Sequence, residues 1–115
     1  MNPDLFQQLD RVIHEKGRLS IVSLLAASPE LSFVELRDTL GMTDGNLSVH
    51  LQTLRRAGYV AVSRSSRNRR PWTTCSLTPK GRAAFEKYLA ALEQIVAEGR
   101  RAAGSERPPA EDAKG

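Results

Sequence analysis

Basic side chains are concentrated in one continuous part of the sequence. Between Gly45 and Phe85 the chain contains no Asp or Glu. The basic residues of this acid-free stretch are Arg55, Arg56, Arg64, Arg67, Arg69, Arg70, Lys80 and Arg82. The formal net charge of +4 is therefore +8 in this stretch and −4 elsewhere. A surface of one sign repels itself, and duplex nucleic acid relieves that repulsion by releasing its condensed counterions. The pattern predicts a nucleic-acid partner.

A predicted helix near the start of this stretch could bring polar side chains to the edges of bases. Thr43 is a suitable N-cap and leucines recur at helical spacing after it, so we expect a helix from Thr43 to Ala57. Gln52 could bind an adenine edge and Val49 a thymine methyl, while Gly45 allows a close approach to phosphate. The candidate DNA-binding residues are Thr43, Gly45, Asn46, Ser48, Val49, Gln52, Thr53 and Arg56, with base contacts expected from Asn46, Ser48, Val49 and Gln52. The alternative is a merely solvated polar face.

A predicted hairpin follows this helix. Residues 59–64 and 73–77 have the composition of paired strands, and the polar loop from Ser65 to Trp72 lies between them. Three arginines within four positions of that loop suit contacts with phosphates or a minor groove. The candidate residues are Arg64, Arg67, Asn68, Arg69 and Arg70. The alternative is a solvated, disordered hairpin tip.

Other helices must position these two elements. Apolar spacing predicts helices over residues 4–16 and 79–101, and another from Leu19 that is separated from the first by Gly17 and ends at Ser28-Pro29. A helix over residues 33–40 is predicted by a capping box of Ser32 and Glu35. The expected fold is α+β and mostly α, with residues 1–103 forming one domain and residues 104–115 a disordered tail.

The last predicted helix carries more apolar surface than a small domain can cover. Its stripe contains Phe85, Tyr88, Leu89, Leu92, Ile95 and Val96, and the first predicted helix offers Leu5, Leu9 and Val12. We therefore expect these nine residues to form a two-fold interface that makes a homodimer. The alternative is that the last helix packs only on its own domain.

The remaining reactive side chains have ordinary structural explanations. His50 is expected to pack at the core margin with one hydrogen bond, and His14 to end the first helix. Cys75 is expected to be a buried hydrophobe, with a redox-sensing thiol as the alternative. Trp72 and Phe33 are expected to pack in the core or on a strand. Two His and one Cys do not make a metal site, so we expect no metal or other cofactor.

Composition excludes several classes of protein. No paired carboxylates, activated nucleophile or phosphate-cradling Gly loop is recognisable, so no catalytic residues are expected and the chain is not predicted to be an enzyme. No apolar stretch approaches the ~20 residues that cross a bilayer. The first residues lack a basic segment followed by an apolar run, so we expect no secretory signal and a cytoplasmic location.

Taken together, these features resemble the winged helix-turn-helix transcription regulators, especially small proteins of the MarR and ArsR groups. The resemblance covers roughly residues 10–90, and its blocks are HEKGRLSIVSLL, LSFVELRDTLGMTDGNLSVHLQTLRRAGYV and RRPWTTCSLTPKGRAAFEKY. It implies a recognition helix over residues 43–57, a wing over residues 65–72 and a homodimer.

The expected function is sequence-specific binding of double-stranded DNA by a homodimeric repressor at a pseudo-palindromic operator. The alternative is a winged-helix module that binds protein. A small-molecule effector is compatible with this fold but is not indicated. The operator, the choice between repression and activation, and control by Cys75 oxidation stay open.

Overall fold

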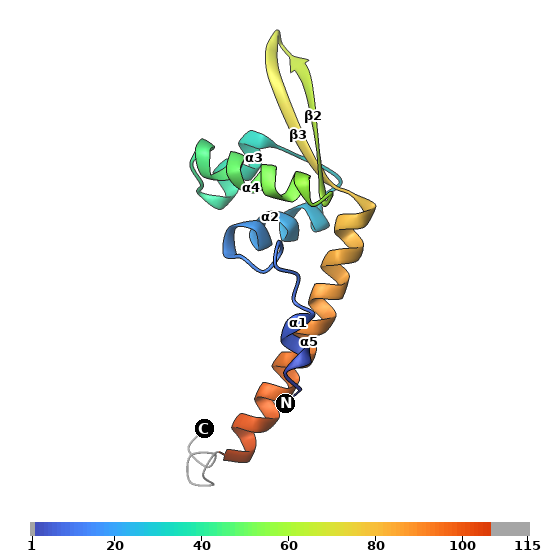
Figure 1. Ribbon diagram of the computed structural model, residues 1–115. Coiled ribbons are helices and arrows are strands. Elements are labelled where there is room, and N and C mark those ends of the chain that lie inside the picture. Colours follow the sequence, from blue (N-terminus) through green and yellow to red (C-terminus); the bar gives the residue numbers. More distant parts are fainter. Residues whose placement is uncertain (1, 107–115) are drawn as a thin grey trace.

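The computed structural model describes residues 2–106, in which helices and a small sheet form an elongated molecule of 66 × 30 × 23 Å. The elements are α1 (Asp4–Gln7), α2 (Lys16–Ala27), β1 (Leu31–Ser32), α3 (Phe33–Leu40), α4 (Asp44–Arg56), β2 (Val60–Arg67), β3 (Arg70–Leu77) and α5 (Pro79–Glu106). The antiparallel sheet has the order β1-β3-β2. The β2–β3 hairpin projects at one end, and α5 runs away from it toward the other (Figure 1).

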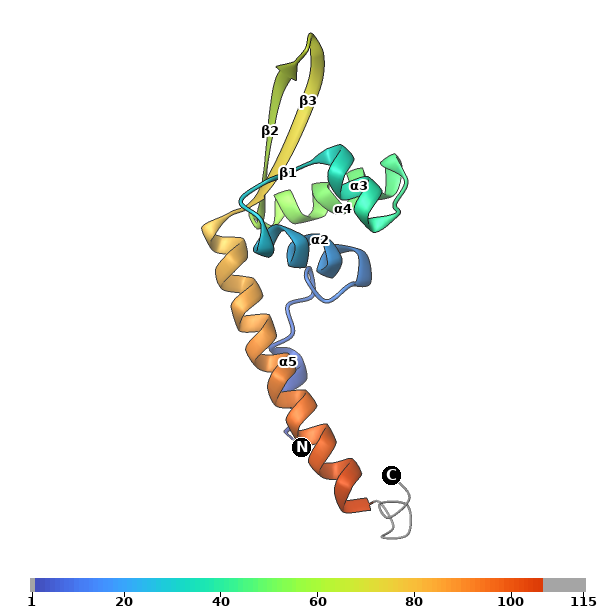
Figure 2. The same cartoon turned by 180° about the vertical axis from the view of Figure 1, so that it is seen from behind.

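One hydrophobic core joins α2, α3, α4 and the base of the sheet. Its buried members are Ile21, Val22, Leu25, Leu36, Leu47, Leu51, Leu54, Val60 and Cys75. The leucines of α4 contribute the stripe expected from the sequence, so that helix turns its other face outward. The view from behind shows α5 leaving this core, with only α1 beside its middle part (Figure 2).

Local signals set the ends of α3 and α4 as predicted. The Ser32 hydroxyl accepts from the Glu35 amide at 3.0 Å, and the Glu35 carboxylate accepts from the Ser32 amide at 2.9 Å. Gly41 follows α3 with a φ of 65°, and the Thr43 hydroxyl accepts from the Asn46 amide at 3.1 Å. These caps fix the short turn that holds α4 beside α3.

The prediction of a first helix over residues 4–16 is wrong. Only Asp4–Gln7 is helical, and residues 8–15 form irregular turns. The Asp10 side chain accepts from the amides of Val12 and Ile13 at 2.8 and 3.2 Å, and such bonds compete with a helix. Glu15 then caps α2, so Gly17 lies in the first turn of that helix and does not separate two helices.

The hairpin is more regular than its sequence suggests. Strands β2 and β3 pair without interruption up to Arg67 opposite Arg70, so most of the loop expected over residues 65–72 is strand. Only Asn68 and Arg69 form the turn, with φ angles of 52° and 65°. Positive φ at both central residues is what a type I′ turn requires, and this turn follows the twist of the strands.

Helix α5 extends to Glu106, beyond the end near Arg101 that the sequence predicts. Most of the tail expected to be disordered, residues 107–115, lies outside the described part of the chain. No helix within residues 2–106, α5 included, combines the length and the apolar character needed to cross a membrane.

Candidate nucleic-acid interface

The outward face of α4 is polar and open to solvent. The predicted contact residues Gly45, Asn46, Ser48, Val49, Gln52 and Arg56 are exposed, as is the capping residue Thr43. Val49 is 61% exposed, so its methyl groups can be reached from outside. Thr53 is half-buried, and its hydroxyl donates to the Val49 carbonyl at 3.2 Å. Seven of the eight predicted positions on this helix can therefore be reached from outside.

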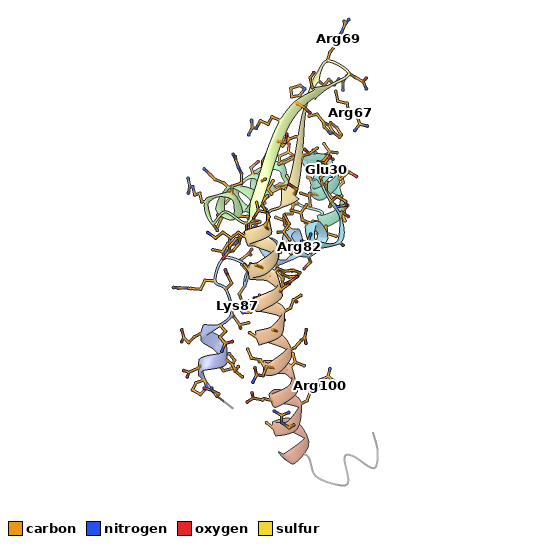
Figure 3. The ribbon with its side chains drawn as sticks, turned by 90° about the vertical axis from the view of Figure 1, so that its right-hand side faces the viewer. Glu30, Arg67, Arg69, Arg82, Lys87 and Arg100 are labelled. Atoms are coloured by element: carbon orange, nitrogen blue, oxygen red, sulfur yellow. The ribbon has the colours of Figure 1, made fainter. Side chains whose placement is uncertain are left out.

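The hairpin carries its basic side chains at different places along its length. Arg64, Arg67, Asn68, Arg69 and Arg70 are all exposed. Figure 3 shows Arg69 at the tip with Arg67 close below it. Arg64 lies nearer the base, where its side chain shares a hollow with residues of α4. The predicted wing residues therefore extend from α4 to the hairpin tip.

Arg67 has a defined position because its guanidinium carbon lies 4.8 Å from the centre of the Trp72 ring. Trp72 lies opposite Ser65, two positions before Arg67 on β2, so Arg67 and Trp72 are diagonal neighbours across the two strands. A guanidinium over an indole face is an attractive arrangement. Trp72 thus packs on a strand as expected, and it also supports a basic side chain.

The basic residues of the acid-free stretch form no salt bridges in the described part of the chain. Within residues 2–106 none of the eight forms a salt bridge, whereas Arg18 and Arg37 bind Glu15, Asp38 and Asp44. Arg82 donates instead to the carbonyl of Ala26 at 3.5 Å. The charge of Arg67 helps to lower the pKa of Glu35, but no carboxylate holds any of the eight side chains in a salt bridge among the described residues. Their charge therefore remains available to a polyanion.

A hollow of about 420 Å³ separates α4 from the base of the hairpin. It is lined by Phe33, Ser48, Leu51, Gln52, Arg55, Val62, Arg64 and Thr73. Arg55 was counted in the acid-free stretch but was not among the candidate DNA-binding residues of the predicted helix. It lies seven positions after Ser48, which puts the two on nearly the same side of a helix, and that spacing could have found it.

The structure gives most of the remaining reactive residues structural roles. His50 packs at the core margin as expected, but the expected hydrogen bond is absent, since its Nδ1 atom lies 3.6 Å from the Glu15 carboxylate. The His14 ring bonds to the Tyr88 hydroxyl at 2.8 Å, although no helix ends at His14. Cys75 is 1% exposed, and burial raises its pKa to about 11, which makes the thiol a poor nucleophile.

The nine residues expected at a dimer interface divide into three groups by exposure. Leu5 and Tyr88 are 3% and 1% exposed, so this chain buries them itself and the reason to assign them to a partner is lost. Leu89 and Val96 are 36% and 43% exposed. The half-buried remainder is Leu9, Val12, Phe85, Leu92 and Ile95. Phe6 is 49% exposed on α1 and was not among the nine predicted residues.

The described residues contain no cluster of three or more His, Cys, Asp or Glu that could hold a metal ion. Asp44, at the start of α4, is engaged by the Arg37 guanidinium at 3.0 Å. What this surface offers is therefore hydrogen bonding, unpaired positive charge and one exposed valine, a combination suited to recognising a polyanion.

Comparison with known proteins agrees with this geometry. A family model described as the winged helix DNA-binding domain matches residues 18–96, more than half of the 115-residue chain. The chain is 33% identical over 85 residues to an uncharacterised protein of Methanocaldococcus jannaschii, covering 74% of this chain and 92% of that protein.

Solved structures share the fold. A transcriptional regulator homologue from Pyrococcus horikoshii OT3 superposes with a TM-score of 0.78 at 23% identity, over 84% of this chain and 97% of that one. The YusO protein of Bacillus subtilis gives 0.68 at 17% identity, over 97% and 76%. The resemblance found in the sequence is confirmed, and the family is not one of enzymes. This chain belongs to the family of winged helix DNA-binding domains.

Proposed function

We propose that this protein is a homodimeric transcriptional regulator of the MarR-like type that binds a pseudo-palindromic site in double-stranded DNA and represses by occupying it. The observation that carries the proposal is the exposed polar face of α4 beside a hairpin whose arginines form no salt bridge within residues 2–106. The name of the Pyrococcus horikoshii neighbour, a transcriptional regulator homologue, supports the same function.

In this proposal α4 enters a major groove. The groove is wide enough for a helix, and each base pair shows a distinct set of donors, acceptors and methyl groups there. Asn46, Ser48 and Gln52 supply hydrogen-bonding groups, and the exposed Val49 meets a thymine methyl. Gly45 has no atom within 4 Å of where a Cβ would lie, so the chain leaves room for phosphate at the helix start. These side chains would give the binding its sequence preference.

The hairpin then approaches the neighbouring minor groove. Arg69 lies at its tip, with Arg67 and Arg70 next to it (Figure 3). Arginine binds phosphate with two parallel hydrogen bonds and is attracted to the negative potential of a narrow minor groove. The hairpin would therefore add affinity, together with some selection of DNA shape.

A second copy of the chain would supply the other half-site. The exposed apolar side chains of Phe6, Leu89 and Val96 lie on α1 and α5, away from the hairpin. A two-fold axis through this surface would bury them and hold two copies of α4 about one helical turn apart, ~34 Å. The bound dimer would then block polymerase from the DNA. This function requires a location with access to the chromosome, which is the cytoplasm.

The decisive experiment is selection of bound sequences from a random duplex pool, followed by a salt titration of the selected site. We expect an inverted repeat, and a slope of log affinity against log salt of roughly −7 to −11 for ~8 to 12 phosphate contacts in a dimer. A slope near −2, or a pool that never enriches, would contradict the proposal. A protein partner retained after nuclease treatment would favour an interaction module instead.

A further inference from the structure

The hollow between α4 and the hairpin base brings basic groups from two separate elements together. Arg55 lies on α4 and Arg64 on β2, and both line the same space of about 420 Å³. Ser48, Gln52 and Thr73 add polar groups, while Phe33, Leu51 and Val62 supply apolar lining. No Asp or Glu is among the lining residues.

The two guanidinium groups have no acidic counterpart. Neither takes part in a salt bridge within the described residues. The positive charge of Arg55 is felt at the sheet, because it opposes the rise that burial causes in the pKa of Cys75. Arg55 is therefore directed toward the hairpin side of α4. Two like charges along one hollow favour an anion between them.

The position of the hollow identifies the anion. The inference rests on the proposed function, in which α4 occupies a major groove and the hairpin tip reaches the neighbouring minor groove. These two grooves are separated by one sugar-phosphate strand, so that strand must pass between α4 and the hairpin. The hollow is where the protein has room for it.

We infer that this hollow is the seat of a DNA backbone strand, in which Arg55 and Arg64 bind the oxygens of phosphates on either side of one deoxyribose. The Ser48 and Thr73 hydroxyls can donate to the same phosphates, and the apolar lining suits the carbon face of the sugar. Arginine fits this task better than lysine because its planar group binds two phosphate oxygens at once. Contacts of this kind fix the register of α4 on the duplex and carry no base information.

The test compares Arg55→Ala and Arg64→Ala with Lys87→Ala, which removes an exposed charge on α5 (Figure 3). Each hollow variant removes one phosphate contact per protomer, so the salt slope of a dimer should become shallower by about 2. Affinity should fall by on the order of 10- to 100-fold, and by the same factor on the selected site and on random duplex. Lys87→Ala should change neither quantity. Arg55→Lys should restore the salt slope but only part of the affinity.

A second experiment locates the contact on the DNA. Single uncharged methylphosphonates are placed one at a time along each half-site, and the affinity of each duplex is measured. For the unaltered protein, we expect a loss at phosphates between the major-groove and minor-groove contacts. Arg55→Ala should no longer sense one of these substitutions, whereas Gln52→Ala should still sense it. This difference separates loss of a phosphate contact from loss of a base contact.

The outcomes distinguish this inference from the proposed function. One outcome is that Arg55→Ala and Arg64→Ala leave the salt slope unchanged while removal of the hairpin-tip arginines makes it shallower. In that case the protein binds DNA but the hollow does not hold the backbone. If the unaltered protein enriches no duplex, the proposed function fails and the inference fails with it. Both side chains are exposed, so thermal unfolding should show all variants to be folded.

Discussion

The two halves of this molecule expose different chemistry. The basic half, which consists of α4 and the β2–β3 hairpin, presents polar side chains and arginines that form no salt bridge among the described residues. The stalk, which consists of α1 and the part of α5 from Phe85 onward, mixes both signs of charge and exposes Phe6, Leu89 and Val96. Unpaired charge favours a polyanion, and exposed apolar surface favours another protein surface. In the proposed function, each half therefore meets a different partner.

The halves meet at a small joint, which any coupling between their partners would have to cross. The amide of Thr78 donates to the Tyr59 carbonyl at 2.9 Å, and the Thr78 hydroxyl donates to the Gly58 carbonyl at 2.6 Å. Gly81, in the first turn of α5, packs directly on the Tyr59 carbonyl. Tyr59 also donates to Asp10 of the segment that leads from α1 to α2. The joint therefore ties the hairpin base to the start of α5 and to the segment that follows α1.

The largest effect should come from removing the charge of the hairpin tip. The triple variant Arg67→Ala, Arg69→Ala and Arg70→Ala loses six contacts per dimer if each side chain binds one phosphate. Affinity for the selected duplex should fall by on the order of 10³-fold, and the salt slope should become shallower by about 5. Fluorescence anisotropy at several salt concentrations measures both quantities.

The matched control removes charge from the stalk, as Lys87→Ala with Arg100→Ala, two exposed residues of α5 (Figure 3). If electrostatics acted only through the net charge of the protein, the control and the hairpin variant would lose the same affinity for each charge removed. An equal loss per charge would therefore break the distinction between the halves.

The next effect concerns the stalk. Leu89→Glu with Val96→Glu puts two carboxylates on one side of α5, since residues seven apart lie about 20° from each other around a helix. Both side chains are exposed in one chain, so each protomer should stay folded while the dimer dissociates. Duplex affinity should then fall by about 10², because the second half-site no longer adds to the first. Sedimentation at tens of micromolar measures the oligomeric state.

Gln94→Glu provides the control for the stalk, because Gln94 is exposed and lies about 140° around α5 from Leu89. It should leave the dimer and its duplex affinity unchanged. An unaltered protein that already sediments as a monomer would show that the apolar stalk has another partner or none.

The joint offers a smaller effect on stability. In Gly81→Ala the added Cβ would collide with the carbonyl oxygen of Tyr59, which is backbone and cannot turn away. The free energy of unfolding should fall by about 1–3 kcal/mol as α5 is displaced from the hairpin base. Gly104→Ala, where no atom lies within 4 Å of the added Cβ, should cause no loss. Denaturant unfolding compares the two, and equal stabilities would show that the joint is not tightly packed.

Local sequence signals predicted the ends of α3 and α4 better than the stalk. The capping box at Ser32, the turn at Gly41 and the cap at Thr43 depend on residues within a few positions, and all three are confirmed. The hairpin strands were predicted too short because pairing with a partner strand, and not composition, makes residues 65–67 and 70–72 extended. The Asn68-Arg69 turn also lacks the glycine that commonly marks such a turn.

Tertiary position explains the other differences. An apolar stripe shows that a side chain needs cover but not which chain supplies it, so Tyr88 was assigned to a partner although its own protomer buries it. Arg55 was not assigned to the interface because its position beside the hairpin is a tertiary feature, which the pattern of α4 does not contain. Asp10 ended the predicted first helix through side-chain hydrogen bonds that spacing alone does not show.

The smallest effect tests whether the joint couples the halves through Tyr59. Its hydroxyl donates to Asp10, and this hydrogen bond, with burial and the nearby negative charge, raises the pKa of Tyr59 to about 12. The folded state therefore favours the neutral phenol. This contribution to stability is fully present below the ordinary pKa near 10 and is lost as the pH rises toward 12. Tyr59→Phe should lower the free energy of unfolding at neutral pH by about 1 kcal/mol, since a partly exposed bond to a charged group is worth less than a buried one.

Two measurements decide this last point. Spectrophotometric titration should show both tyrosines ionising late, because burial also raises the pKa of Tyr88. Asp10→Asn should bring only the pKa of Tyr59 closer to the ordinary range. Hydrogen exchange in Tyr59→Phe should speed up at the amides of Val12 and Ile13, which Asp10 holds, while the amides of α4 stay protected. Faster exchange along α4 as well would show that the connection to the stalk also steadies the basic half, and the two halves would then have to be treated as one coupled unit.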